Sequence, residues 1–369
     1  MIEFNWCYNI MHKDKCVANI RSDGSCEICL PSFMPYNLYF DEKAKSLDDR
    51  VNNLTNFYYW CSTRVLSLDR KHAKLILNTL GKKQAVTDKD RAEISISYHC
   101  LTLTDVYWLK SQEEKIKFSD ISLYNNSLSN AFVDVSLRGQ NPTINNLEFF
   151  TQGKVADDVS TSGVAPKAWV RKDDGIYLYK DGDEKEVNAE LLASKIADCF
   201  KCNHIEYFED YYSGEKVSAS KLITSESKSI VTMEFVDVYA INKGTDKFSI
   251  IMKNDSFDYY MMNIIDYLVG NTDRHWGNWG FFVDNETNEL TELHPLMDFN
   301  KAFTSYDDIE GAKCLTVKEP KSQKQAAIDA VKTIGLNRIK EIDDSWFYDD
   351  KIKDMFYKRL NLLEKTNMN

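Results

Sequence analysis

Helical spacing of apolar residues dominates the last third of the chain. In residues 257–268 (FDYYMMNIIDYL) the apolar side chains recur three and four positions apart, which places them on one face of a helix. Residues 352–364 (IKDMFYKRLNLLE) repeat this spacing, and residues 186–200 show it once more upstream. We therefore predict three amphipathic helices in these segments.

Shorter apolar segments predict strands. Such short apolar segments occur at residues 4–11 and 15–20 near the start, and at residues 175–180 (GIYLYK) and 229–238 (SIVTMEFVDV) in the middle of the chain. Residues 279–284 and 290–298 flank the turn-forming sequence NETNE, so they predict a hairpin whose second strand ends at Asp298.

The middle of the N-terminal half has sequence patterns that predict helices. Residues 67–81 have a polar start and a glycine stop, and Thr87 and Asp90 have the spacing of a capping box. The polar stretch RGQNPTINN, residues 138–146, predicts the main domain boundary. We predict a largely helical N-terminal region (1–140), a small β-sheet lobe (150–240) and a helical C-terminal lobe (241–369).

Composition narrows the class of protein. The 369 residues are 43% hydrophobic, which is enough for a large core, and the formal net charge of -11 argues against nucleic acid as the main partner. The start MIEFNWCYNI does not have the pattern of a secretory signal, and no apolar run reaches the roughly 18 residues of a membrane helix. We expect a cytoplasmic protein that does not enter a membrane.

The nine cysteines are scattered, and two pairs have CxxC spacing. These pairs are Cys26 with Cys29 and Cys199 with Cys202. A zinc site would have to join the two pairs, which lie about 170 residues apart, and no flanking histidines support it. Buried or exposed reduced thiols are the favoured interpretation.

The chemistry concentrates in the segment GNTDRHWGNWGFF, residues 270–282. Asp273 and Asn278 lie in a loop between a predicted helix and the predicted hairpin, whose base brings Asp298 toward them. Carboxylate and amide oxygens are suitable ligands for Mg²⁺, which also keeps phosphates and waters in its shell. Phosphoryl transfer needs this set of groups: one carboxylate for the acceptor hydroxyl, and an amide and a carboxylate for the metal.

The order Asp273, Arg274, His275, Asn278 and then Asp298 resembles the catalytic and metal-binding loops of the HipA-type serine/threonine kinases. The same DRHxxN pattern is similar to that of phosphoinositide kinases, which share the atypical protein-kinase fold. The resemblance implies an α+β, bilobal protein-kinase-like fold that uses ATP and Mg²⁺. It also implies that Asp273 is the catalytic carboxylate and that Asn278 and Asp298 hold the metal.

An upstream stretch, STSGVAPK, is similar to the phosphate-binding loop of this family. Gly163 would allow close approach of phosphate, and Lys167 would neutralise its charge. The resemblance also places a self-phosphorylated serine at Ser160, where a phosphate would repel the nucleotide and eject the loop.

Three further segments fit the nucleotide site by the same resemblance. Lys180 closes a predicted strand and would reach the nucleotide phosphates, while Glu190 on the following helix would pair with it. Glu234, Phe235 and Val236 would face adenine from the strand that leads into the interlobe hinge.

The other loop residues have structural interpretations. We expect His275 to hydrogen-bond within the loop, and Trp276 and Trp279 to pack beneath it. The role of Arg274 stays open, because its side chain could pair with a phosphate or carboxylate in the loop or could contact only solvent.

Several functions remain open at this stage. The resemblance favours transfer of the γ-phosphate of ATP to a protein serine or threonine, with an antitoxin-type partner as in HipA systems and no direct binding of nucleic acid. Alternatives are a lipid or small-molecule kinase on the same fold, and a pseudokinase that binds nucleotide as an interaction module. A metal-dependent hydrolase would need more ligands than six scattered histidines supply.

Overall fold

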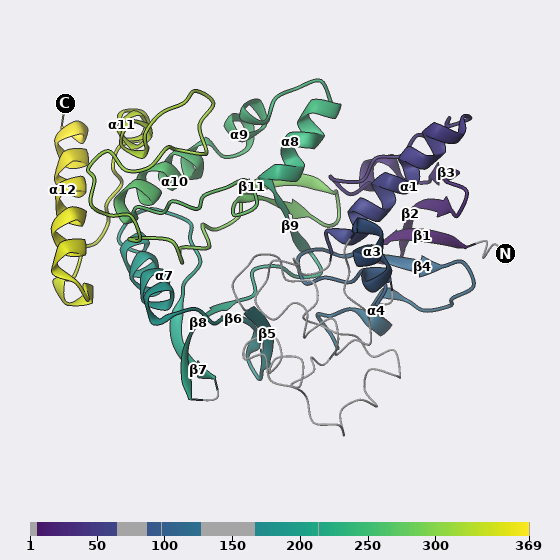
Figure 1. Ribbon diagram of the computed structural model, residues 1–369, viewed down its shortest axis with the longest axis horizontal. Helices are drawn as coiled ribbons and strands as arrows, with labels where there is room; N and C mark the ends of the chain where they lie inside the picture. Colours follow the sequence, from purple (N-terminus) through teal and green to yellow (C-terminus); the bar gives the residue numbers. More distant parts are fainter. Residues whose placement is uncertain (1–5, 65–86, 97, 127–166, 213, 369) are drawn as a thin grey trace. The chain divides into compact units, whose positions relative to one another are not determined.

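The computed structural model describes residues 6–64, 87–96, 98–126, 167–212 and 214–368 (Figure 1). The chain forms two compact units. Unit 1 contains residues 1–180, 222–229 and 284–289, and unit 2 contains residues 181–221, 230–283 and 290–369. The helix predicted over residues 67–81 and the polar break at 138–146 lie outside the described residues, so the boundary predicted there stays a prediction.

Unit 1 contains an antiparallel sheet of four strands in the order β3-β2-β1-β4. The two strands predicted near the start are confirmed as β1 and β2, and they pair through a tight turn at Lys13, whose φ of 50° suits a two-residue hairpin connection. The strands are β1 (Cys7–His12), β2 (Lys15–Arg21), β3 (Cys26–Ile28) and β4 (Tyr107–Ser111).

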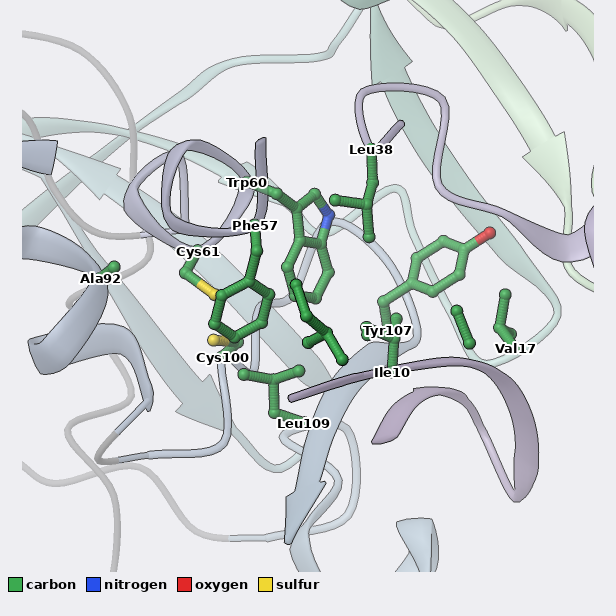
Figure 2. Packing of buried hydrophobic residues seen from close by; sticks show 12 residues of the cluster. Ile10, Val17, Leu38, Phe57, Trp60, Cys61, Ala92, Cys100, Tyr107 and Leu109 are labelled. Carbon is green, nitrogen blue, oxygen red and sulfur yellow. The ribbon is translucent and has the colours of Figure 1, made fainter. Parts of the chain in front are cut away.

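Helices cover this sheet. They are α1 (Leu47–Ser62), α3 (Asp88–Ile96) and the short α4 (Phe118–Ile121), and a 3-10 turn, η1, spans Pro31–Phe33. Figure 2 shows Phe57 and Trp60 of α1 packed with Ile10 and Leu109 of the sheet, in one of the hydrophobic core clusters of unit 1. The predicted capping box of α3 is confirmed, because Thr87 and Asp90 exchange hydrogen bonds of 2.9 and 3.1 Å.

The prediction of a largely helical N-terminal region is wrong for the described residues. Four strands lie there, and β4 falls inside the segment predicted to be helical. The first three residues of β4 are all buried, so it lacks the alternation of apolar and polar positions that identifies a strand with one face in solvent.

A second strand pair of unit 1 is formed by β5 (Lys167–Lys172) and β6 (Gly175–Lys180). The two strands are antiparallel, and Lys167 pairs with Lys180. The strand predicted over residues 175–180 is therefore confirmed.

Unit 2 is built around α10 (Ser256–Val269), ten of whose fourteen residues are buried. This helix contacts α11 and α12, which also contact each other, and it contacts α7 and α9 (Figure 1). The helices predicted in three segments are confirmed as α7, α10 and α12. The remaining helices of this unit are α7 (Glu184–Ala197), α8 (Met233–Asn242), α9 (Lys247–Asn254), α11 (Gln323–Ile334) and α12 (Asp350–Asn367), with a 3-10 turn, η3, at Asp344–Trp346.

Two sets of strands accompany these helices. β7 (Phe208–Tyr212) and β8 (Glu215–Lys221) pair antiparallel, and a three-stranded sheet has the order β11-β10-β9. The predicted hairpin is confirmed as β10 (Gly280–Asp284) and β11 (Glu289–Leu293), and the turn between them belongs to unit 1. No helix among the described residues is long and apolar enough to span a membrane.

The strand predicted over residues 229–238 is half wrong. The observed strand, β9 (Lys228–Thr232), ends at Thr232, and α8 begins at Met233. Thr232 has extended backbone angles, and the backbone amide of Met233 donates to the carbonyl of Trp279 at 2.8 Å. This contact with a distant segment fixes where the strand ends, so the end could not be predicted from residues 229–238 alone.

The buried His12 makes the stability of unit 1 depend on pH. Its side chain lies against the rings of Phe33 and Tyr107, both at 5.0 Å, and neither ring nitrogen has a partner among the described residues. Burial, with a contribution from the charge of Lys13, lowers the pKa of His12 from 6.5 to about 4. Below pH 6.5 the unfolded chain binds a proton that the folded chain rejects, so stability falls as pH falls from 6.5 toward 4.

We expect the His12→Phe variant to lose less stability than the wild type between pH 7 and pH 4.5, by at most about 3 kcal/mol. The ring of phenylalanine fits the same aromatic surroundings without a titrating nitrogen. Urea unfolding at a series of pH values measures the difference. Parallel pH profiles for the two proteins would show that His12 is not responsible.

Candidate active site

The predicted catalytic loop follows α10 directly. This helix ends at Gly270, whose φ of 62° is left-handed, and a Cβ there would lie 2.4 Å from the ring of Tyr306. The loop leads into β10 at Gly280, where a Cβ would lie 2.0 Å from the carbonyl oxygen of Val231. Glycine is thus required at both ends of the loop, which fixes its entry and its exit.

The main chain of Asp273 is held by its neighbours in the loop. Its amide donates to Oδ1 of Asn271 at 3.2 Å. Its carbonyl accepts from the amide of His275 at 2.8 Å and from Nδ2 of Asn278 at 2.9 Å. The carboxylate is half-buried, and no hydrogen bond to it is found among the described residues.

The side chain of Asn278 has a defined orientation. Because its Nδ2 donates to the carbonyl of Asp273, its Oδ1 is the atom left to accept from a ligand or to bind a cation. The residue itself is buried.

Asp298 lies on the loop after β11. That strand ends at Leu293, so the prediction that the strand runs to Asp298 is wrong. Asp298 has a φ of 62°, which is uncommon outside glycine and persists where surrounding contacts impose it. Those contacts include its amide, which donates to the hydroxyl of Tyr207 at 3.1 Å, and its carbonyl, which accepts from Nδ2 of Asn271 at 3.4 Å.

Arg274 is the central residue of the loop, and its role was left open by the sequence. It is buried, and its guanidinium forms two hydrogen bonds with the carboxylate of Asp266 in α10, at 2.9 and 3.0 Å. Burial disfavours its charge, but the charge and hydrogen bonds of Asp266 raise the pKa of Arg274 above its ordinary value.

The same guanidinium joins the loop to the segment that carries Asp298. Its Nη1 donates to the carbonyl of Asn278 at 2.9 Å and to the carbonyl of Met297, the residue before Asp298. Its Cζ also lies 5.3 Å from the ring centre of Phe299. Together with Asn271, Arg274 places Asp273, Asn278 and Asp298 in one hydrogen-bonded network.

The remaining loop residues behave largely as expected. His275 is exposed, and its Nδ1 accepts from the amide of Gly277 at 3.1 Å, so it bonds within the loop. Trp279 is buried and packs on Tyr259. Trp276 is half-buried and lines a groove of about 420 Å³, and the ammonium of Lys247 lies 3.3 Å from its ring centre.

The predicted phosphate-binding residues are partly described. Lys167 and Lys180 are opposite each other on β5 and β6, so their side chains leave the same face of the hairpin. Lys180 is buried. Gly163 and Ser160 lie outside the described residues.

Glu190 is buried in α7 and accepts a hydrogen bond from the hydroxyl of Ser218. Its predicted pairing with Lys180 stays a prediction. Residues 234–236, predicted to face adenine from an extended strand, lie instead in the first turn of α8. The amide of Glu234 donates to the carbonyl of Trp276 at 3.1 Å, and Val236 is buried, so an adenine contact by Glu234, Phe235 and Val236 also stays a prediction.

Metal ligands of the zinc type do not gather in the described part of the chain. No group of three or more histidine, cysteine, aspartate or glutamate side chains that could hold a metal ion occurs there. All nine cysteines are free thiols. Asn278 and Asp298 supply only an amide and a carboxylate, which suits Mg²⁺, because this ion takes its other ligands from phosphates and water.

Comparisons with known proteins agree with this geometry at the level of fold. No protein-family model matches the sequence, and no curated protein matches it either. Among solved structures, HipA of Shewanella oneidensis MR-1 matches 98% of this chain and 99% of its own, with a TM-score of 0.56 and 13% identity. That HipA was solved in a toxin-antitoxin complex with HipB and operator DNA. The Helicobacter pylori proinflammatory kinase CtkA matches 54% of this chain and 90% of its own, with a TM-score of 0.42 and 17% identity.

The chain has a HipA-like kinase fold, which confirms the resemblance found in the sequence. The predicted α+β class is confirmed as a mixture of helices and several small antiparallel sheets. The arrangement of the parts as two lobes stays a prediction.

Proposed function

We propose that this protein is a kinase that transfers the γ-phosphate of ATP to a serine or threonine hydroxyl of a protein. The observation that carries the proposal is the network around Arg274, which holds Asp273, Asn278 and Asp298 together on a HipA-like kinase fold.

Each residue of the network has a role in this proposal. The carboxylate of Asp273, which the loop itself does not use, orients the acceptor hydroxyl and takes its proton. Oδ1 of Asn278 and the carboxylate of Asp298 hold Mg²⁺. When bound, Mg²⁺ neutralises the charge that develops on the phosphate oxygens.

Other residues would position the nucleotide. Lys167 and Lys180 hold phosphates from the face of the β5–β6 hairpin, and Gly163 lets the backbone approach them. Glu190 orients Lys180, and residues 234–236 lie near adenine. Most of the rate enhancement then comes from positioning and charge neutralisation.

The biological setting is part of the same proposal. The fold is shared with a HipA that was solved with HipB and operator DNA, so we propose an antitoxin-type protein partner for this chain and a cytoplasmic location. Ser160 would be the site of self-phosphorylation.

The test is phosphate transfer by the purified protein. With Mg²⁺ and γ-labelled ATP, we expect label on the wild-type chain and no label on the Asp298→Asn variant, because the amide is a much weaker metal ligand than the carboxylate. Asp329→Asn, which alters an exposed ion pair with Lys321, is the matched control and should keep the label. Mass spectrometry of the labelled chain then locates the phosphate and tests Ser160.

Two results would contradict the proposal. One is equal labelling of the wild type and Asp298→Asn. The other is a wild-type protein whose unfolding temperature does not respond to ATP with Mg²⁺. Nucleotide binding without transfer to any protein would favour the pseudokinase, and transfer only to an added lipid or metabolite would favour a kinase of that class.

A further inference from the structure

A lysine, Lys301, lies three residues after Asp298 in the chain. The ammonium of Lys301 forms an ion pair with the carboxylate of Glu186, in the first turn of α7. Both side chains are partly exposed, 43% for Lys301 and 27% for Glu186. The pair is therefore accessible from solvent, and it is not a buried structural link.

The backbone around Lys301 is fixed on both sides. Phe299 is buried beneath the guanidinium of Arg274, and its carbonyl accepts from the amide of Ala302 at 2.8 Å, which closes a turn around Lys301. The amide of Phe303 then donates to the carbonyl of Val269 at the end of α10, at 2.9 Å. Lys301 is thus presented from a short turn anchored to the helix that also delivers the catalytic loop.

The charges around Lys301 include the catalytic carboxylate. The hydrogen bond that Lys301 donates to the carboxylate of Glu186 raises the pKa of Lys301; burial opposes this effect, and the negative charges of Glu186, Asp273 and Asp183 add to it. Lys301 is therefore a protonated cation, and the negative charge of Asp273 helps to stabilise it. Next to it, Oδ1 of Asn300 is buried without a partner among the described residues.

We propose that Lys301 binds the terminal phosphate of the bound nucleotide, exchanging the carboxylate of Glu186 for a phosphate oxygen. This inference rests on the proposed function. In that function the bond between the terminal phosphorus of ATP and the bridging oxygen breaks, ADP leaves, and the phosphorus bonds to the hydroxyl oxygen held by Asp273, while Asn278 and Asp298 would hold the metal that neutralises the phosphate charge. Lys301 follows Asp298 in the chain, and the negative charge of Asp273 acts on it. Glu186 holds the lysine in place when no phosphate is present.

Comparing ATP with ADP isolates the contact, because only ATP carries the terminal phosphate. We expect Lys301→Met to weaken binding of Mg²⁺-ATP about tenfold, as loss of one charge-assisted hydrogen bond does, and to leave Mg²⁺-ADP binding within about twofold. Isothermal titration calorimetry of the full chain measures both. Lys301→Arg should keep most of the ATP affinity. The matched control is Lys324→Met, which breaks the ion pair with Glu310 elsewhere in unit 2 and should change neither affinity.

Glu186→Gln provides the second variant. It frees Lys301 from its resting partner, so ATP affinity should stay the same or increase, with ADP affinity unchanged. A merely structural ion pair predicts the opposite, namely equal losses in Lys301→Met and Glu186→Gln for both nucleotides, and that result would overturn the inference. Unchanged ATP binding in Lys301→Met would also overturn it. A wild-type protein that binds neither nucleotide is a different outcome, because it would remove the proposed function itself.

Discussion

Asp273→Asn is expected to slow phosphate transfer by about three orders of magnitude, within the range that loss of a general base or orienting carboxylate produces. The asparagine keeps the shape of the side chain but cannot accept the proton of the acceptor hydroxyl. The fold should be unaffected, because the loop uses the amide and the carbonyl of Asp273 and leaves its carboxylate aside. Single-turnover labelling with Mg²⁺ and ATP measures the rate.

Two further measurements make this result specific. The affinity for Mg²⁺-ATP should stay within a few fold of the wild type, since Asp273 acts on the acceptor and not on the nucleotide. The unfolding temperature should also match that of the Asp329→Asn control. A variant that transfers phosphate at the wild-type rate would show that Asp273 is not the catalytic carboxylate.

Arg274→Met is expected to lower the free energy of unfolding by about 3–5 kcal/mol, the usual cost of breaking a buried ion pair from one side. The substitution leaves the carboxylate of Asp266 buried without its cation, and it leaves the carbonyls of Asn278 and Met297 without a donor. Urea unfolding monitored by circular dichroism measures the loss. Lys340→Met, which removes an exposed ion pair with Asp198, should change stability by less than about 0.5 kcal/mol.

The double variant Arg274→Met/Asp266→Leu separates stability from positioning. Removing both charges should recover most of the lost stability, because no unpaired charge remains buried. Phosphate transfer should stay impaired, since the loop and the Asp298 segment are still released from each other. Recovery of activity together with stability would show that Arg274 serves the fold alone.

The sequence by itself determined the local elements of this protein and the identity of its chemical groups. Periodic apolar positions predicted α7, α10 and α12, and turn-forming residues predicted the β10–β11 hairpin. The spacing of Asp273 and Asn278 between these elements indicated the candidate site. Such features depend on residues close together in the chain, so a short window of sequence contains them.

The tertiary structure decided where some strands end and how the site is held together, because these features depend on contacts between residues that are far apart in the sequence. β9 ends and α8 begins at Met233, whose amide donates to the carbonyl of Trp279. β4 has consecutive buried residues, so its sequence lacks the alternation that predicts a strand. Asp298 adopts a left-handed backbone conformation that its neighbours in sequence do not require. Above all, Arg274 lies between Asp266 and Met297, and only folding brings their oxygen atoms within hydrogen-bond distance of one guanidinium.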